Sequence, residues 1–248
     1  MSGWEALFLV VGGVFAGVIN AMAGGGSILT VPLLVIAGVP GNAANGSNRL
    51  GILTSTAASA TSFHRLGVDG LAHAAPILAP VLLGSLVGSM AISQLSDDLF
   101  ETVFGLLMVP LVLLSLRQPK AATDGVVWSR PLTFVVFLGI GLYGGAVQAG
   151  VGLVLLAALS RAGFDLVTAN HIKALITLAV TLVAFPVFIW QGNVVWIPAI
   201  TLAVGLTIGG WIGARIAVEG GERLIRGVMV AAALALSAKM LGVLPFGS

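Results

Sequence analysis

The hydrophobic residues of this chain fall in long runs, separated by short breaks rich in glycine, proline and charged residues. Most runs approach the 17–25 residues or so that a helix needs to cross a bilayer. In the first half the predicted apolar elements cover residues 4–22, 27–37, 43–63, 71–94 and 99–116. In the second half they cover residues 131–148, 153–162, 167–190, 195–217 and 224–244. The pattern predicts an all-α integral membrane protein.

Composition supports membrane residence and excludes several functional classes. Charged residues make up 8% of the chain and hydrophobic residues 58%, with a mean hydropathy of +1.11, whereas a soluble domain carries roughly 25% charged residues. A net charge of +2 without a basic run argues against nucleic-acid binding. The absence of cysteine excludes disulfides, thiolate metal sites and cysteine nucleophiles. No cofactor, metal or catalytic residue is expected, and residues 1–5 do not resemble a cleavable signal.

The chain contains a predicted internal duplication. A single ungapped offset of 125 residues aligns Gly25 with Gly150 and Asn45 with Asn170. The same offset aligns other positions that punctuate the apolar elements: Gly38 with Gly163, Thr56 with Thr181, Gly67 with Gly192, Gly84 with Gly209 and Gly88 with Gly213. We predict a first transmembrane repeat over residues 1–118, a cytoplasmic linker over 119–130 and a second repeat over 131–248.

The distribution of lysine and arginine predicts that the two repeats have opposite orientations. The break near Arg65 is basic, while its repeat mate near Gln191 carries no charge. Cytoplasmic loops are enriched in basic residues, and placing most of them inside requires an odd number of crossings per half. Both chain ends then lie outside. The expected cytoplasmic set is Arg65, Arg117, Lys120, Arg130, Arg161, Lys173, Arg215, Arg223 and Arg226.

The second apolar element of each half is too short to cross a bilayer unaided, because a crossing needs about 20 residues. The first two elements therefore form either a helical hairpin that reaches partway or a tilted, tightly packed pair. Inverted repeats with interrupted helices are common in secondary transporters, whose sites lie near the bilayer midplane.

Glycine-rich turns join the first two elements of each half. Glycines allow a tight reversal and expose backbone N–H groups, and a helix start favours an anion. Ser27 is either the N-cap of the short helix that follows or a residue that comes after the turn. The alternative is that these glycines only allow close helix packing in lipid. The turns and their flanks supply the candidate substrate-binding residues Asn20, Gly24, Gly25, Gly26, Ser27, Gln148, Gly150 and Gly152.

Polar residues also gather near the start of the third element of each half. Polar groups within a span are costly and usually face a cavity or a partner. The cations among them lack an evident acidic partner, apart from Asp165 about two turns before Lys173, and so favour an anionic substrate; snorkelling to the headgroups is the alternative. The candidates are Asn45, Asn48, Arg49, Asn170, His171 and Lys173.

Among these candidates, Asn45 and Asn170 rank highest because the repeat pairs them. Interhelical hydrogen bonding is the alternative role for the amide residues. His171 could titrate near neutral pH and couple a proton to transport, although a structural role is common for such a histidine. His64 and His73 are predicted to lie at the surface.

The run from Gly17 to Ser27, followed by Pro32-Leu33-Leu34 and by Ala44 to Asn48, resembles the TauE/SafE sulfite-exporter family. The second-half runs from Gly144 to Gly152 and from Ala169 to Lys173 resemble the repeated copy in that family. The resemblance covers nearly the whole chain. It implies a multi-pass transporter of the cell membrane for sulfite, thiosulfate or an organosulfonate such as sulfoacetate. It also implies that the glycine turns and the asparagine-rich helix starts line the pathway.

Other functional classes fit the sequence less well. An anion channel remains an alternative, because sequence does not reveal alternating access. An intramembrane enzyme would have only Ser47 and His171 as a nucleophile and base, without a GxSxG turn. A metal or cation transporter would need buried acidic residues. The expected partners are a small anion and the lipid bilayer; the coupling ion (proton or sodium) and any homo-oligomer stay open.

Overall fold

The computed structural model describes residues 1–116 and 128–219, and the described residues form helices with no strand. Helices of the first half are α1 (Gly3–Ala23), α2 (Gly26–Ile36), α3 (Gly41–Arg65), α4 (Leu71–Ala74), the 3-10 turn η1 (Ala75–Ile77), α5 (Leu78–Ile92) and α6 (Asp97–Leu116). Helices of the second half are α7 (Arg130–Ala146), α8 (Val151–Arg161), α9 (Leu166–Trp190) and α10 (Trp196–Glu219). The predicted element over residues 224–244 lies outside the described residues.

Helix boundaries recur at the predicted offset. Both ends of α2 and α8, and both ends of α3 and α9, differ by 125 residues. The α4–η1–α5 segment begins 125 residues before α10. This segment was predicted as one element over 71–94, but a 3-10 turn that contains Pro76 interrupts it, because proline lacks an N–H group for the helical hydrogen bond.

Local signals in the sequence set several of these boundaries. The helix α1 begins with a capping box, in which the Glu5 amide donates to the Ser2 hydroxyl and the Ser2 amide to the Glu5 carboxylate. It ends at Gly24, whose φ of 77° is in the left-handed region that glycine tolerates. The Asp165 carboxylate caps α9 by accepting from the amides of Val167 and Thr168. Asp165 is therefore a helix cap, and Lys173 has other partners.

The short second helix of each half confirms the predicted interruption. The helices α2 and α8 each have 11 residues, which at 1.5 Å per residue gives a length of about 16 Å, half of a bilayer core. Each packs against the helix before it, α2 on α1 and α8 on α7. In each half, a helix of 17 or 21 residues is thus followed by one of half the length of a bilayer core.

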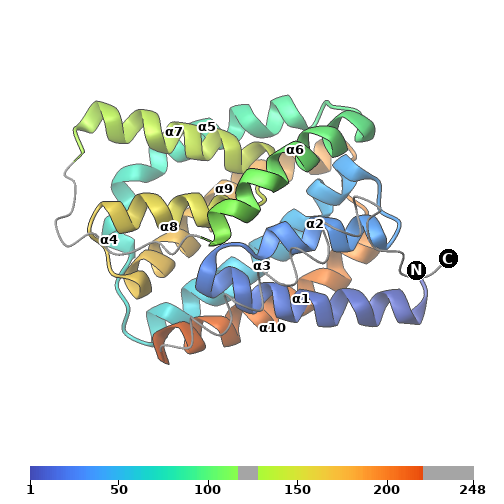
Figure 1. Ribbon diagram of the computed structural model, residues 1–248, viewed down its shortest axis with the longest axis horizontal. Helices are drawn as coiled ribbons and strands as arrows, with labels where there is room; N and C mark the ends of the chain where they lie inside the picture. Colours follow the sequence, from blue (N-terminus) through green and yellow to red (C-terminus); the bar gives the residue numbers. More distant parts are fainter. Residues whose placement is uncertain (117–127, 220–248) are drawn as a thin grey trace.

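The helices assemble into two bundles that mix the sequence halves. The lower bundle in Figure 1 contains α1, α2, α3 and α10, and the upper bundle contains α5, α7, α8 and α9. Glycines allow α10 to pack closely on α1, and α5 on α7. A Cβ at Gly209 of α10 would collide with the Val14 carbonyl of α1, and a Cβ at Gly88 of α5 would collide with the Leu142 carbonyl of α7. The α3 and α9 helices cross at the interface between the bundles.

The two hairpins enter the molecule from opposite ends. In Figure 1, α1 runs from the right, where the N-terminus lies, toward the left, and α7 runs from the left toward the centre. The orientation of the two repeats across a membrane stays a prediction, as do the number of crossings and the placement of the chain ends. At the left end, the guanidinium carbons of Arg65 and Arg215 both lie 5.4 Å from the ring centre of Trp211. Two basic residues from different halves thus share one end of the molecule.

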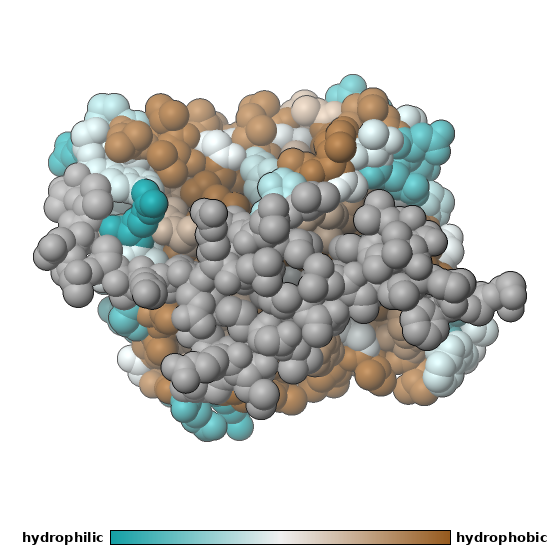
Figure 2. Space-filling view, viewed as in Figure 1, coloured by the Kyte–Doolittle hydropathy of each residue, from teal (hydrophilic) through white to brown (hydrophobic). Residues whose placement is uncertain are grey.

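The outer surface between the two ends is apolar. Large side chains are exposed along α1, α5 and α10, among them Leu7, Val87 and Ile200. Figure 2 shows apolar residues mainly along the upper and lower edges and hydrophilic residues mainly toward the left and right ends. Within the described part, four segments are long and apolar enough to cross a bilayer: Gly3–Ala23, Leu71–Ile92, Leu166–Trp190 and Trp196–Glu219. The chain is a multi-pass membrane protein.

Candidate functional site

The tips of the two hairpins touch at the centre of the molecule. A Cβ added to Gly152, near the start of α8, would lie 2.5 Å from the carbonyl oxygen of Gly24 at the end of α1. A Cβ added to Gly24 would in turn collide with the Gly152 backbone. Only glycine at both positions permits this approach, so the turns place the N-terminal ends of α2 and α8 beside each other.

Ser27 joins the two tips by hydrogen bonds. Its hydroxyl donates to the Gln148 carbonyl at 3.2 Å and accepts from the Gly150 amide at 3.3 Å. The N-cap of α2 is Gly25, and no side chain caps it. Of the two alternatives for Ser27, the N-cap is therefore wrong and a position after the turn is correct. Because the second hairpin comes so close, the Ser27 hydroxyl instead bonds to the turn that precedes α8.

Arg49 and Asn45 of α3 contact the carbonyl end of α7. The Arg49 guanidinium donates to the carbonyls of Gly144 (3.3 Å), Gly145 (2.5 Å) and Ala146 (2.9 Å). The Asn45 amide donates to the Ala146 carbonyl at 2.9 Å. The guanidinium carbon also lies 4.2 Å from the ring centre of Phe188 on α9. Arg49 is 0% exposed, so its side chain does not snorkel to the headgroups.

Lys173 and Asn170 of α9 make the matching contact with the end of α1. The Lys173 ammonium donates to the carbonyls of Asn20 (2.7 Å) and Ala21 (2.9 Å) and to the side-chain oxygen of Asn170 (2.6 Å). The last carbonyls of a helix have no partner within it and carry a partial negative charge. Both cations therefore have backbone partners, contrary to the expectation that they lack internal ones.

Two further amides complete the polar interior. The Asn48 side-chain oxygen accepts from the Thr30 hydroxyl of α2 at 2.6 Å, and the Gln148 amide donates to the Thr181 hydroxyl of α9 at 2.6 Å. Gln148 holds its backbone at a φ of 61°, which is unusual for a residue other than glycine. Thr30, Thr181 and Phe188 are not among the residues that the sequence predicts for the site, although the repeat alignment marks Thr181.

Some buried polar atoms in this region have no hydrogen-bond partner among the described residues. Two are donors, the Asn48 side-chain nitrogen and the Arg49 Nε; two are acceptors, the side-chain oxygens of Asn45 and Gln148. A buried polar group without a partner is costly. These atoms therefore mark positions at which a bound polar ligand would be stabilising.

All the candidate substrate-binding residues are buried, but they are not all together. His171 lies away from the hairpin tips, with its ring stacked at 5.8 Å on Phe63 near the end of α3 and packed against Gly70. His64 and His73 are exposed, as predicted. The remaining candidates surround the two tips: the turn residues themselves, and the α3 and α9 side chains that contact them.

The buried interior carries positive charge. Among the described residues, the fully buried ionisable side chains are Arg49, His171 and Lys173, and no aspartate or glutamate is among them. In the same part of the chain, no group of three His, Cys, Asp or Glu residues is placed to hold a metal. The buried ionisable side chains of the described part are thus all basic.

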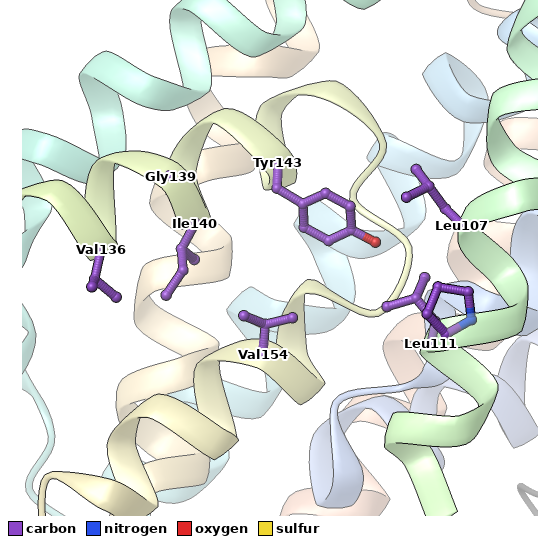
Figure 3. Close-up of a pocket in the computed structure, with 8 residues that line it drawn as sticks. Leu107, Leu111, Val136, Gly139, Ile140, Tyr143 and Val154 are labelled. Carbon is purple, nitrogen blue, oxygen red and sulfur yellow. The ribbon is translucent and has the colours of Figure 1, made fainter.

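A separate cavity of about 350 Å³ lies between α6, α7 and α8. Its lining is apolar apart from Tyr143, whose hydroxyl donates to the Ala149 carbonyl in the turn before α8. Figure 3 shows Leu107, Leu111, Ile140 and Val154 around this space. It offers no charge to an anion, so we do not assign the site to it.

Comparisons with known proteins relate the chain to membrane transporters. A profile of the sulfite exporter TauE/SafE family matches residues 9–240. A probable membrane transporter protein of a Sinorhizobium species is 27% identical over 238 residues, which cover 94% of this chain and 91% of the relative. The probable membrane transporter YfcA of Escherichia coli is 27% identical over 239 residues, covering 95% and 88%. A probable membrane transporter protein of Haemophilus influenzae is 28% identical over 234 residues, covering 92% and 91%. The chain thus belongs to the sulfite exporter TauE/SafE family of membrane transporters.

Proposed function

We propose that this protein is a secondary transporter that moves a small sulfur-containing anion across the cell membrane by alternating access. The family and the names of the relatives support a membrane transporter. The observation that carries the choice of an anion is the buried charge. Arg49 and Lys173 are buried in the interior, and the buried side chains of the described residues include no aspartate or glutamate.

Electrostatics favours an anion at the hairpin tips. Removing a cation from water costs several kcal/mol, even after the protein relaxes. The carbonyl ends of α1 and α7 offset part of this cost, but each supplies only about half a negative charge. The N-terminal ends of α2 and α8 add partial positive charge at the same place. A bound anion would neutralise the remainder.

The unpartnered donors favour an oxyanion. Asn48 and Arg49 are neighbours in sequence on α3, and each has an unpartnered donor, the side-chain nitrogen of Asn48 and the Nε of Arg49. Sulfite, thiosulfate and sulfonates present several acceptor oxygens, and hydrogen bonds from charged donors to such oxygens are strong. The family name supports a sulfur oxyanion within this class. The direction of transport and the coupling ion, proton or sodium, are not assigned.

The repeated hairpins support a carrier over a channel. Repeats with interrupted helices place a site where either end of the molecule can open to it. The equal spacing of the helix boundaries and the opposite directions of α1 and α7 support inverted repeats. The backbones of Gly24 and Gly152 are in contact, so no opening separates the two tips at that point. An anion channel is the second candidate.

The enzyme alternative has weaker support. The Ser47 hydroxyl accepts from the Val195 amide at 2.8 Å, and His171 stacks on Phe63. Neither side chain is bonded to the other, as a nucleophile and its base would be. A cation transporter would require buried acidic ligands.

The decisive experiment is counterflow of radiolabelled sulfite or thiosulfate in proteoliposomes. With the membrane potential held at zero by equal potassium concentrations and valinomycin, vesicles preloaded with the unlabelled anion should accumulate the labelled anion transiently, which a channel cannot produce under these conditions. Lys173→Met and Asn45→Leu should abolish accumulation, while Arg65→Gln, an exposed cation on α3, should not. Transport without counterflow would indicate a channel. Normal counterflow by both variants would refute the proposed site.

A further inference from the structure

The two interior cations make crossed contacts between the sequence halves. Arg49 belongs to the first half and binds the carbonyl end of α7 in the second. Lys173 belongs to the second half and binds the carbonyl end of α1 in the first. Each cation also crosses from one bundle to the other, because α3 and α1 lie in one bundle and α9 and α7 in the other.

The contacted carbonyls occupy equivalent positions in the repeat, but the cations do not. At the offset of 125 residues, Asn20 and Ala21 match Gly145 and Ala146. Lys173, however, matches Asn48, and Arg49 matches Ala174. The two halves thus meet the same requirement, a cation on the carbonyl end of the opposite hairpin, with different residues one position apart. If these contacts were only packing inherited from the duplication, they would use the same residue types at equivalent positions. The residue types differ, so inheritance alone does not explain the pattern.

The geometry of each contact suits a side chain that holds a helix end in place. Three acceptors lie within 2.9 Å of the Lys173 ammonium, which has three N–H donors. The Arg49 guanidinium reaches three successive carbonyls through its terminal nitrogens. Neighbouring asparagines, Asn170 and Asn45, take part in each cluster.

We propose that Arg49 and Lys173 are reciprocal positioning residues, each of which holds the tip of the hairpin that belongs to the other half. This proposal rests on the proposed function and deepens it. By fixing the hairpin ends and neutralising their carbonyl charge, the two cations keep the starts of α2 and α8 together and accessible to an anion. Arg49 is on α3 and Lys173 is on α9. If α9 moved relative to α3, each cation would therefore displace the hairpin tip that it holds in the other half.

The test is a crossed pattern of cysteine reactivity, which the cysteine-free chain makes straightforward. Single reporters are introduced as Ala23→Cys in the first hairpin turn and Ala149→Cys in the second, both at buried alanines. In the otherwise unchanged protein, a small methanethiosulfonate should modify either cysteine slowly. Lys173→Gln should raise the rate at the Ala23→Cys site alone, and Arg49→Gln at the Ala149→Cys site alone. We expect at least about a tenfold increase, because a hydrogen bond to a charged group is worth more than a factor of ten.

Control variants separate this role from a general loss of packing. Arg65→Gln should change neither rate, and the conservative Lys173→Arg and Arg49→Lys should retain most of the protection. An increase at both cysteines in either neutral variant, or at neither, would overturn the proposal. Lys173→Gln and Arg49→Gln are expected to raise the labelling rate at different cysteines. If one of the two variants does not fold, the other is therefore sufficient to test the proposal. The labelling needs no substrate, so its outcome is independent of whether the protein transports an anion.

Discussion

At the scale of single residues, the interior is organised by side chains that bond to the ends of helices. Arg49, Lys173 and Ser27 all bind backbone groups of another helix, and Asp165 does the same for its own helix. Backbone groups at helix ends have no partner within the helix, and in lipid no water is available to replace it. Polar residues in this chain therefore mark helix ends that lie inside the protein.

Asp165 offers a test of this principle outside the apolar spans. Asp165→Ala should lower stability by about 0.5–2 kcal/mol, because α9 loses its N-cap. Partial burial of the Asp165 carboxyl opposes ionisation, but hydrogen bonds from Thr168 and Val167 prevail and lower its pKa. A lowered pKa in the folded state means that the stabilisation is present at neutral pH and is lost as the pH falls through that pKa.

Thermal unfolding in detergent as a function of pH measures this effect. Asp165→Asn is the matched control, because asparagine is also a good N-cap but does not ionise. It should retain most of the stability at neutral pH and lose the acid dependence contributed by this residue. An Asp165→Ala variant as stable as the unchanged protein at neutral pH would contradict the assignment of the cap.

The residues of the interior could be chosen from the sequence, but their partners could not. Asn45, Asn170, Arg49 and Lys173 stood out because polar groups are rare within apolar elements. Their bonds to Gly144–Ala146 and to Asn20–Ala21 join positions about 95 to 153 residues apart, and backbone carbonyls leave no signature in a sequence. The same limit left the role of Ser27 open between two alternatives, because its partner lies 123 residues away.

At the scale of helices, the decisive feature is the half-length second helix of each half, α2 and α8. Apolar runs and glycine turns located α2 and α8 within one or two residues, because the signals that end a helix are local. The division of the predicted element over 71–94 into α4, η1 and α5 was missed, although Pro76 was the available signal. The mixing of halves within each bundle was not predicted, because which helices pack together depends on long-range contacts.

Glycine substitutions test the contact between the hairpin tips. Gly24 and Gly38 both have a positive φ, 77° and 84°, so an alanine at either position is strained by a similar amount, about 1 kcal/mol. A Cβ at Gly24 would collide with the Gly152 backbone, while one at Gly38 would meet nothing within 4 Å. Gly24→Ala should therefore abolish anion binding and counterflow, and Gly38→Ala should cost little of either. Equal effects of the two substitutions would show that the contact is unimportant.

At the scale of the whole molecule, the account depends on two repeats that enter the bilayer from opposite sides. The sequence predicted this arrangement from the asymmetry of lysine and arginine, and the structure contributes hairpins that run in opposite directions. Arg65 and Arg215 at one end of the bundles belong to the predicted cytoplasmic set.

Gly67 and Gly192 provide a direct test of orientation, because they are repeat mates in exposed turns with open space around them. A membrane-impermeant thiol reagent added to intact cells should label a Gly192→Cys variant and leave a Gly67→Cys variant unlabelled until the cells are opened. The chain contributes no background cysteine. Labelling of both variants from outside would exclude inverted repeats, and the reverse pattern would place the basic end outside.

The central claim, a positively charged interior that binds a sulfur oxyanion, is tested most directly by ligand-dependent thermal stability of the purified protein. A ligand that binds only the folded state stabilises it by about 2.7 kcal/mol at a hundredfold excess over Kd. We predict that sulfite, thiosulfate or a small sulfonate raises the melting temperature at constant ionic strength, while chloride and divalent cations do not. Stabilisation by a metal cation, with no response to any of these anions, would contradict the account.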